Sequence, residues 1–139
     1  MPFCYGRTVR FGETDAAGVV YFANLLHLCH EAYEASLAEM GFDLKTFFSA
    51  GAIAVPIVHA EANFYHPLFC GDRLTITLAP EPMTESSFAI TYEIWPHDPE
   101  AGDRPAVTAL TRHVCIEIAS RQRQALSAEL QRWLAQFAG

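Results

Sequence analysis

The sequence has 139 residues with a formal net charge of −7, and 51% of its residues are apolar while 18% are charged. This length accommodates one domain with a buried core, which we expect over residues 1–139, and the apolar fraction excludes a disordered chain. No apolar run approaches the roughly 18 residues of a membrane-spanning helix, and the acidic balance argues against nucleic acid or an anionic membrane as the main partner.

The N-terminal segment and the cysteines indicate the cellular compartment of the protein. Residues 1–7 contain no basic stretch followed by a long apolar one, so we expect no secretory signal. The cysteines are widely separated and form no C-x-x-C pair, which argues against a zinc site and a disulfide framework: Cys4, Cys29, Cys70 and Cys115. A protein of the reducing cytoplasm is therefore expected.

The first half of the chain predicts a strand, a helix and a second strand. Alternating residues predict a strand over residues 3–11. After a loop at 13–20, apolar residues recur at helical spacing and predict a helix of about five turns: Leu25, Leu28, Cys29, Ala32 and Met40. Gly41 is placed to end this helix. A strand is expected over residues 53–65, where Pro56 suggests an edge or bulge.

The second half predicts three strands and a closing helix. Alternation over 74–78 and 88–94 predicts two strands joined by a turn at 80–87. A loop rich in turn formers at 96–105 precedes a long strand over 106–118. Ser127 is expected to cap a helix whose apolar face consists of Leu130, Trp133, Leu134 and Phe137. The order predicts an α+β domain in which a long helix packs against a five-stranded antiparallel sheet.

The segment 11–24, FGETDAAGVVYFAN, resembles the loop before the central helix of hotdog thioesterases of the 4-hydroxybenzoyl-CoA thioesterase type. It contains an aspartate, two small residues, a glycine, two aliphatic residues and an aromatic pair. The resemblance covers nearly the whole chain and is closest to the branch that hydrolyses 1,4-dihydroxy-2-naphthoyl-CoA on the route to phylloquinone, through segments 29–34, 58–60, 70–74 and 113–116. Phe22 stands where the thioesterases linked to the Tol-Pal system usually carry histidine, which disfavours that subfamily.

The resemblance implies catalytic roles within this loop. Thioester hydrolysis needs a nucleophile or an activated water, and a donor for the oxyanion that develops. The resemblance gives the first role to Asp15, as nucleophile or general base, and the second to the backbone amide of Phe22 at the helix start. Gly18 permits close backbone approach. Taken alone, an aspartate between a strand and a helix more often stabilises a loop. Glu13 is a weaker candidate that we expect to be solvated.

Coenzyme A carries phosphate groups, so an acidic protein needs a local cationic patch to bind it. Arg121 and Arg123 follow the longest predicted strand, where related enzymes place cationic contacts to the nucleotide. Two solvated surface arginines are an equally good interpretation of this pair. Arg73 and Arg112 are further candidates.

Tyr21, His59 and Phe64 are further residues that we expect to bind the substrate. Aromatic side chains can stack on an aromatic acyl group, although residues of these types within a sheet are more often structural. Helical spacing also brings histidine and glutamate together at residues 27–34, but the metal-binding order H-E-x-x-H is absent and the resembling family uses no metal. We therefore expect neither a metal nor a cofactor, because coenzyme A is part of the substrate.

The expected function is hydrolysis of an aromatic acyl-CoA, with 1,4-dihydroxy-2-naphthoyl-CoA as the leading substrate. The resemblance implies a homodimer as the minimal active unit, within a homotetramer, whose sites lie between paired subunits. Exposed edges of long strands also favour edge-to-edge dimerisation. A broad acyl-CoA or acyl-carrier-protein thioesterase and a non-catalytic acyl-CoA-binding module remain as alternatives.

Overall fold

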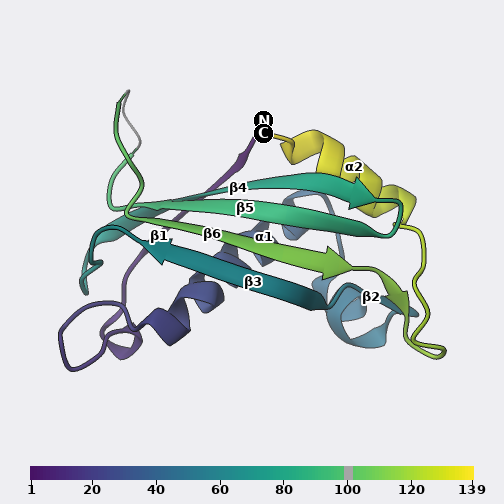
Figure 1. The fold of residues 1–139 in the computed structure, drawn as a ribbon, viewed down its shortest axis with the longest axis horizontal. Coiled ribbons are helices and arrows are strands. Elements are labelled where there is room, and N and C mark those ends of the chain that lie inside the picture. The colour runs from purple at the N-terminus through teal and green to yellow at the C-terminus, as the bar shows by residue number, and fades with distance from the viewer. Residues whose placement is uncertain (99–101) are drawn as a thin grey trace.

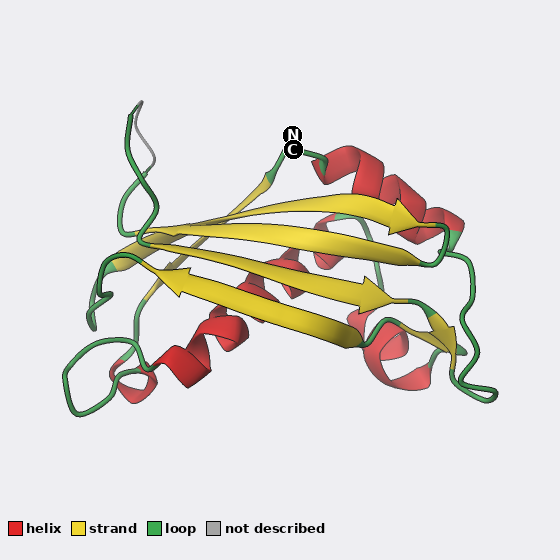
Figure 2. Cartoon of the chain, in the orientation of Figure 1, coloured by secondary structure: helices red, strands yellow, loops and turns green. Residues whose placement is uncertain are grey.

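The computed structural model describes residues 1–98 and 102–139, in which two helices lie behind one antiparallel sheet (Figures 1 and 2). The strands are β1 (Phe3–Thr8), β2 (Ile53–Ala54), β3 (Ile57–Phe64), β4 (Arg73–Thr84), β5 (Ser87–Trp95), β6 (Val107–Val114) and β7 (Ile116–Glu117). The helices are α1 (Leu25–Glu39) and α2 (Ala128–Phe137), with short helical segments η1 (Phe11–Glu13), η2 (Phe22–Asn24) and η3 (Thr46–Ala50). The main sheet has the order β1-β4-β5-β6-β3, and β2 pairs with β7 separately.

α1 packs across one face of the main sheet because its apolar residues recur on one side. Leu28 and Leu37 are fully buried, and burial of each contributes about 2 kcal/mol. The helix meets alternate residues of β4 and β5, all with no exposed surface: Leu74, Ile76, Leu78, Phe88, Ile90, Tyr92 and Ile94. The predicted five-stranded sheet with a long helix against it is therefore confirmed. No helix in the described ranges has the length and apolar character needed to cross a bilayer.

α2 closes the same core. The Leu130 N–H donates to Ser127 Oγ at 3.2 Å, which confirms the predicted cap. Trp133 is fully buried and its Nε1–H donates to Ser36 Oγ on α1 at 2.9 Å. The end of α2 brings the two termini together, as Figure 1 shows, where the Met1 ammonium donates to the carbonyl of Ala138 at 2.7 Å.

Two strands predicted as continuous are interrupted side by side. Residues 53–65 divide into β2 and β3 before and after Pro56, and residues 106–118 divide into β6 and β7 at Cys115. The Val114 N–H donates to the Pro56 carbonyl at 3.1 Å, so the two interruptions face each other. The prediction of continuous strands is wrong here because the chain leaves the main sheet and pairs β2 with β7 instead.

Three other predicted boundaries also differ. The first strand ends at Thr8, because the chain turns into η1, and α1 has 15 residues, about four turns rather than five. The predicted turn at 80–87 is mostly strand, since β4 continues to Thr84. β1 pairs with β4 only as far as Leu78, so the prolines beyond it meet no strand on that side. The predicted loop at 96–105 includes residues 99–101, which lie outside the described residues.

His113 is a buried titratable group of this core. It is 1% exposed, and its ring stacks on Phe88 at a centroid distance of 4.8 Å. Its Nδ1 lies 3.1 Å from the Val55 carbonyl, and its Nε2 lies 2.9 Å from Thr111 Oγ1. A neutral ring satisfies both contacts, with Nδ1–H donating to the carbonyl and Nε2 accepting from the hydroxyl. Burial lowers the pKa of His113 to about 4.

Stability should therefore fall as the pH falls from 6.5 to 4. In this window the unfolded state takes up a proton at His113, whose ordinary pKa is 6.5, while the folded state resists protonation until about pH 4. We expect a loss of roughly 1–3 kcal/mol in the free energy of unfolding, measured by urea titration across this range. His113→Gln cannot titrate and should show a correspondingly smaller loss. Equal losses in both proteins would contradict the assignment.

Candidate active site

The loop between η1 and η2 closes on itself through backbone hydrogen bonds. The Asp15 N–H donates to the Val19 carbonyl at 2.9 Å, and the Gly18 N–H donates to the Asp15 carbonyl at 2.9 Å. Gly18 has a φ of 82°, in the left-handed region that glycine adopts at little cost. The chain reverses at this residue, which leaves Asp15 exposed at the surface of the loop.

The Asp15 carboxylate is oriented through one of its two oxygens. Oδ1 accepts a hydrogen bond from the Ala17 N–H at 2.8 Å, a local turn that restricts the side chain. Oδ2 has no partner among residues 1–98 and 102–139. An exposed carboxylate with one free oxygen is able to attack a carbonyl carbon or to accept a proton from water.

Phe22 begins η2, which leads directly into α1. Its backbone N–H has no acceptor in the part of the chain that the structure describes, as expected for the first residue of a helical segment. Phe22 is 66% exposed and its ring meets Tyr21 edge to face at 4.9 Å, so it does not lie in the core. An unpaired N–H at a helix start is a donor for negative charge that develops on a ligand.

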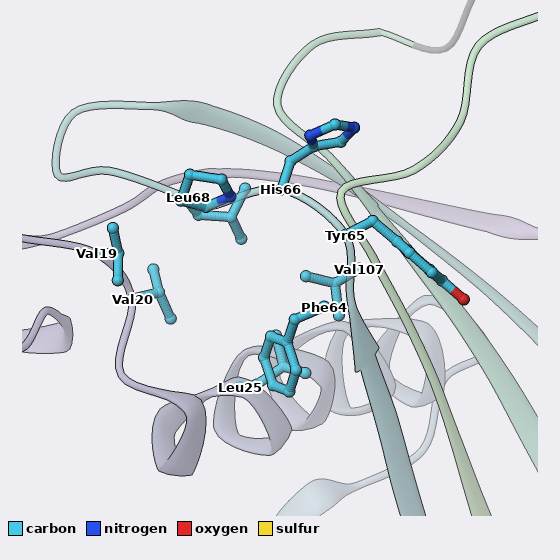
Figure 3. Close-up of a pocket in the computed structure, with 9 residues that line it drawn as sticks. Val19, Val20, Leu25, Phe64, Tyr65, His66, Leu68 and Val107 are labelled. Atoms are coloured by element: carbon cyan, nitrogen blue, oxygen red, sulfur yellow. The ribbon is translucent and has the colours of Figure 1, made fainter.

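A cavity of about 280 Å³ lies beside this loop (Figure 3). Val19 and Val20 line one side of it, and Phe64 at the end of β3 lines the other. The remaining lining residues are Leu25, Tyr65, His66, Pro67, Leu68 and Val107. The Val20 N–H donates to the Leu68 carbonyl at 2.8 Å, which fixes the loop to the segment before β4 that lines the same cavity. Phe64 is thus the predicted acyl-group contact that shares an apolar cavity with the loop.

A second cavity, of about 270 Å³, lies at the other end of β3. Aromatic rings from α1 and η3 form part of its wall, and the Tyr33 hydroxyl is buried there without a hydrogen-bond partner in the described residues. Burial lowers the pKa of His30 in this wall, against the opposing effect of the Glu34 charge. The full lining is His30, Tyr33, Glu34, Phe48, Val55, Pro56, Ile57 and His113.

The other predicted binding residues do not meet Asp15 within one chain. Arg121 and Arg123 are exposed on the turn after β7, at the opposite end of the sheet from the Asp15 loop (Figure 1). His59 is exposed on β3 and its Nε2 lies 3.1 Å from Glu61 Oε1. No group of three or more His, Cys, Asp or Glu side chains suited to a metal ion occurs in residues 1–98 and 102–139.

Glu13 is not solvated, which corrects the sequence prediction. Its side chain is 16% exposed, and Oε1 lies 2.6 Å from Arg7 Nη2 and accepts from the Arg10 N–H at 2.8 Å. Burial raises the pKa of Glu13, but these hydrogen bonds and the charges of Arg7 and Arg10 outweigh it and hold the pKa below its usual 4.5. One feature of the sequence could have indicated this burial. Arg7 alternates with Tyr5 on the face of β1 that turns toward α1, and a cation on that face needs a carboxylate partner.

The sequence matches the family model described as thioesterase-like superfamily over residues 9–134. The chain belongs to this thioesterase-like superfamily. It is 52% identical over 137 residues to the 1,4-dihydroxy-2-naphthoyl-CoA hydrolase of Trichodesmium erythraeum (strain IMS101), which covers 99% of this chain and 98% of that relative. It is 51% identical over 130 residues to the enzyme of the same name from Crocosphaera subtropica (strain ATCC 51142 / BH68), with 94% and 93% covered.

Solved structures agree with this membership. A crystal structure of a 1,4-dihydroxy-2-naphthoyl-CoA thioesterase from Synechocystis matches this thioesterase-like chain with a TM-score of 0.87 and 36% identity, covering 97% of this chain and 96% of that one. The hotdog fold expected from the sequence is therefore confirmed.

The left-handed conformation at Gly18 gives a test of the loop. Gly18→Ala meets no atom within 4 Å, so its cost comes from the backbone alone, about 1 kcal/mol in the free energy of unfolding. Gly12→Ala is the matched control, since Gly12 also has open space and lacks a positive φ. We expect only Gly18→Ala to lower the unfolding temperature and to speed hydrogen exchange over residues 13–22, because alanine at position 12 adopts its backbone conformation without strain. Equal changes in the two variants would show that the turn does not depend on this conformation.

Proposed function

We propose that this thioesterase-like protein hydrolyses 1,4-dihydroxy-2-naphthoyl-CoA to 1,4-dihydroxy-2-naphthoate and coenzyme A. The observation that carries the proposal is the loop from Asp15 to Phe22, which presents a carboxylate oxygen and a backbone N–H without partners in the described chain. The choice of acyl group is supported by relatives at 51% and 52% identity that are named for this thioester. We further propose that the reaction serves phylloquinone biosynthesis in the cytoplasm.

Asp15 and Phe22 supply the two requirements of the reaction in this proposal. The free Oδ2 of Asp15 attacks the thioester carbonyl carbon to give a mixed anhydride that water then cleaves, or it takes a proton from the attacking water. In both routes the carbon–sulfur bond breaks and coenzyme A leaves as the thiol. The Phe22 N–H donates to the carbonyl oxygen as it becomes negatively charged, and the start of α1 adds its dipole. No cofactor takes part.

The free edge of β3 supports a dimer. β3 is the last strand of the main sheet and pairs only with β6 among the described strands. Its exposed residues include Val58 at 63% and Phe64 at 51%, and an exposed apolar edge strand is a template for pairing with another chain. We propose that a second copy pairs along this edge, and that two such dimers form a homotetramer.

This pairing also accounts for the separation of Asp15 from the arginines. A copy related by a two-fold axis runs antiparallel along β3, so the start of its β3 lies beside the end of this chain's β3. The turn that carries Arg121 and Arg123, and the aromatic cavity at Tyr33, then approach the Asp15 loop of the other subunit. In this arrangement each site takes its carboxylate from one subunit and its cationic contacts from the partner.

The function is tested with a panel of aromatic and straight-chain CoA thioesters. We expect the aromatic substrates to be preferred, and Asp15→Asn to lower kcat by roughly 10² or more because a positioned base or nucleophile is lost. Asp43→Asn is the matched control, since Asp43 Oδ1 also accepts from a backbone N–H two residues on, at 3.2 Å, but lies outside the site. It should keep wild-type turnover.

Near-wild-type turnover of Asp15→Asn would end the catalytic assignment. Equal rates on straight-chain substrates would favour a broad thioesterase. Tight binding of an acyl-CoA without any turnover would favour a binding module.

The shared site is tested by combining two defective subunits. Arg121→Ala with Arg123→Ala should raise KM for CoA substrates and leave a pantetheine thioester little affected. A purified heterodimer of this double variant with an Asp15→Asn subunit should regain about one working site, because one site then has both an intact Asp15 and an intact arginine pair. Heterodimer activity no higher than that of the two homodimers would show that both contributions come from one chain. A fully active monomer, shown by sedimentation, would refute the shared site.

A further inference from the structure

The Arg7 guanidinium joins three elements beneath the Asp15 loop. Arg7 lies on β1 with only 8% of its side chain exposed. Its Nη2 lies 2.6 Å from Glu13 Oε1 at the end of η1, and its Nη1 lies 2.8 Å from Glu31 Oε2 on α1. Its remaining contacts are to the Thr8 carbonyl, from Nε at 3.3 Å and from Nη2 at 3.2 Å. A buried cation with two carboxylates and a carbonyl around it is held in one geometry.

The backbone carbonyl of Glu13 is hydrogen-bonded to the other end of the Asp15 loop. This carbonyl accepts from the Tyr21 N–H at 2.9 Å and from Asn24 Nδ2 at 3.1 Å. Tyr21 comes directly before Phe22, and Asn24 ends η2. The residue before Phe22 and the residue that ends η2 are therefore both hydrogen-bonded to the Glu13 carbonyl. The Glu13 side chain is in turn held by Arg7 on β1.

We propose that Arg7 and Glu13 form a positioning pair that holds the Phe22 N–H in the orientation required for the reaction. Neither residue needs to contact the substrate for this role. Arg7 fixes the carboxylate of Glu13, the carbonyl of Glu13 fixes Tyr21 and Asn24, and these fix the peptide between Tyr21 and Phe22. This inference rests on the proposed thioesterase function, because the orientation of the amide matters only if it receives an oxyanion.

Two matched substitutions separate positioning from a general contribution to stability. Glu13→Gln and Glu31→Gln each remove one carboxylate from Arg7 and leave the other in place, so the buried cation keeps a counter-ion in both variants. Only Glu13 contacts the loop through its carbonyl. Arg7→Gln is unsuitable because it would leave two carboxylates without a cation and endanger folding.

We expect Glu13→Gln to lower kcat by roughly 10-fold to 100-fold with little change in KM, as for a misplaced donor. Amide hydrogen exchange in the segment containing Tyr21 should become faster in this variant. Glu31→Gln should lose a similar amount of thermal stability while its kcat and its Tyr21 exchange stay close to wild type. Both kinetic and exchange measurements use the full chain, at a temperature where both variants are folded.

Two results would overturn the positioning role: a wild-type kcat in Glu13→Gln, or equal losses of kcat in the two variants. If the wild-type protein cleaves no thioester in the panel, the proposed function fails and the catalytic part of this inference fails with it. The exchange measurement then still decides whether Glu13 holds the loop, since unchanged Tyr21 exchange in Glu13→Gln overturns that as well. The failure of the pair and the failure of the function are thus distinguished.

Discussion

The apolar stripe of α1 packs against the alternate buried residues of β4 and β5, and this contact fixes where both ends of the helix lie. The start of α1 falls at one end of the sheet, where β1 must connect to it through the Asp15 loop. The middle of α1 falls over the start of β3, where Tyr33 enters the aromatic cavity. Because one helix covers one face of the sheet, both proposed parts of the site depend on this single packing arrangement.

Hydrogen bonding within the site region is uneven in a way that suits the proposed chemistry. Beneath the loop, the donors of Arg7 meet carboxylates and a carbonyl, which restrains the backbone from β1 to η2. At the surface of the same loop, Asp15 Oδ2 and the Phe22 N–H have no partners in the described residues. Groups held in place but left unpaired need no rearrangement to receive a substrate, which is the requirement for electrostatic stabilisation of an oxyanion.

The free edge of β3 relates the fold to the assembly. The cavity at Phe64 and the aromatic cavity at Tyr33 lie at opposite ends of this strand. The turn that carries Arg121 lies at the same end as the aromatic cavity. A single chain therefore separates the groups that contact one CoA thioester in the proposed function. Antiparallel pairing of two copies would bring these groups together, so the proposed dimer would complete the proposed site as well as cover an exposed strand.

The sequence by itself determined the elements whose pattern is local: the alternation in β4 and β5, the stripe of α1, and the Ser127 cap. It also identified the loop that carries Asp15, through a resemblance within one continuous segment. Only the tertiary structure decided which strands pair, and hence why strands end beside Pro56 and why β4 continues past Leu78, where it still pairs with β5. The same holds for Glu13, because its burial depends on a guanidinium from another element and on a fold that brings Glu31, 24 residues from Arg7, to the same cation. Spacing along the chain records local periodicity, whereas contacts between distant residues arise only when the core is packed.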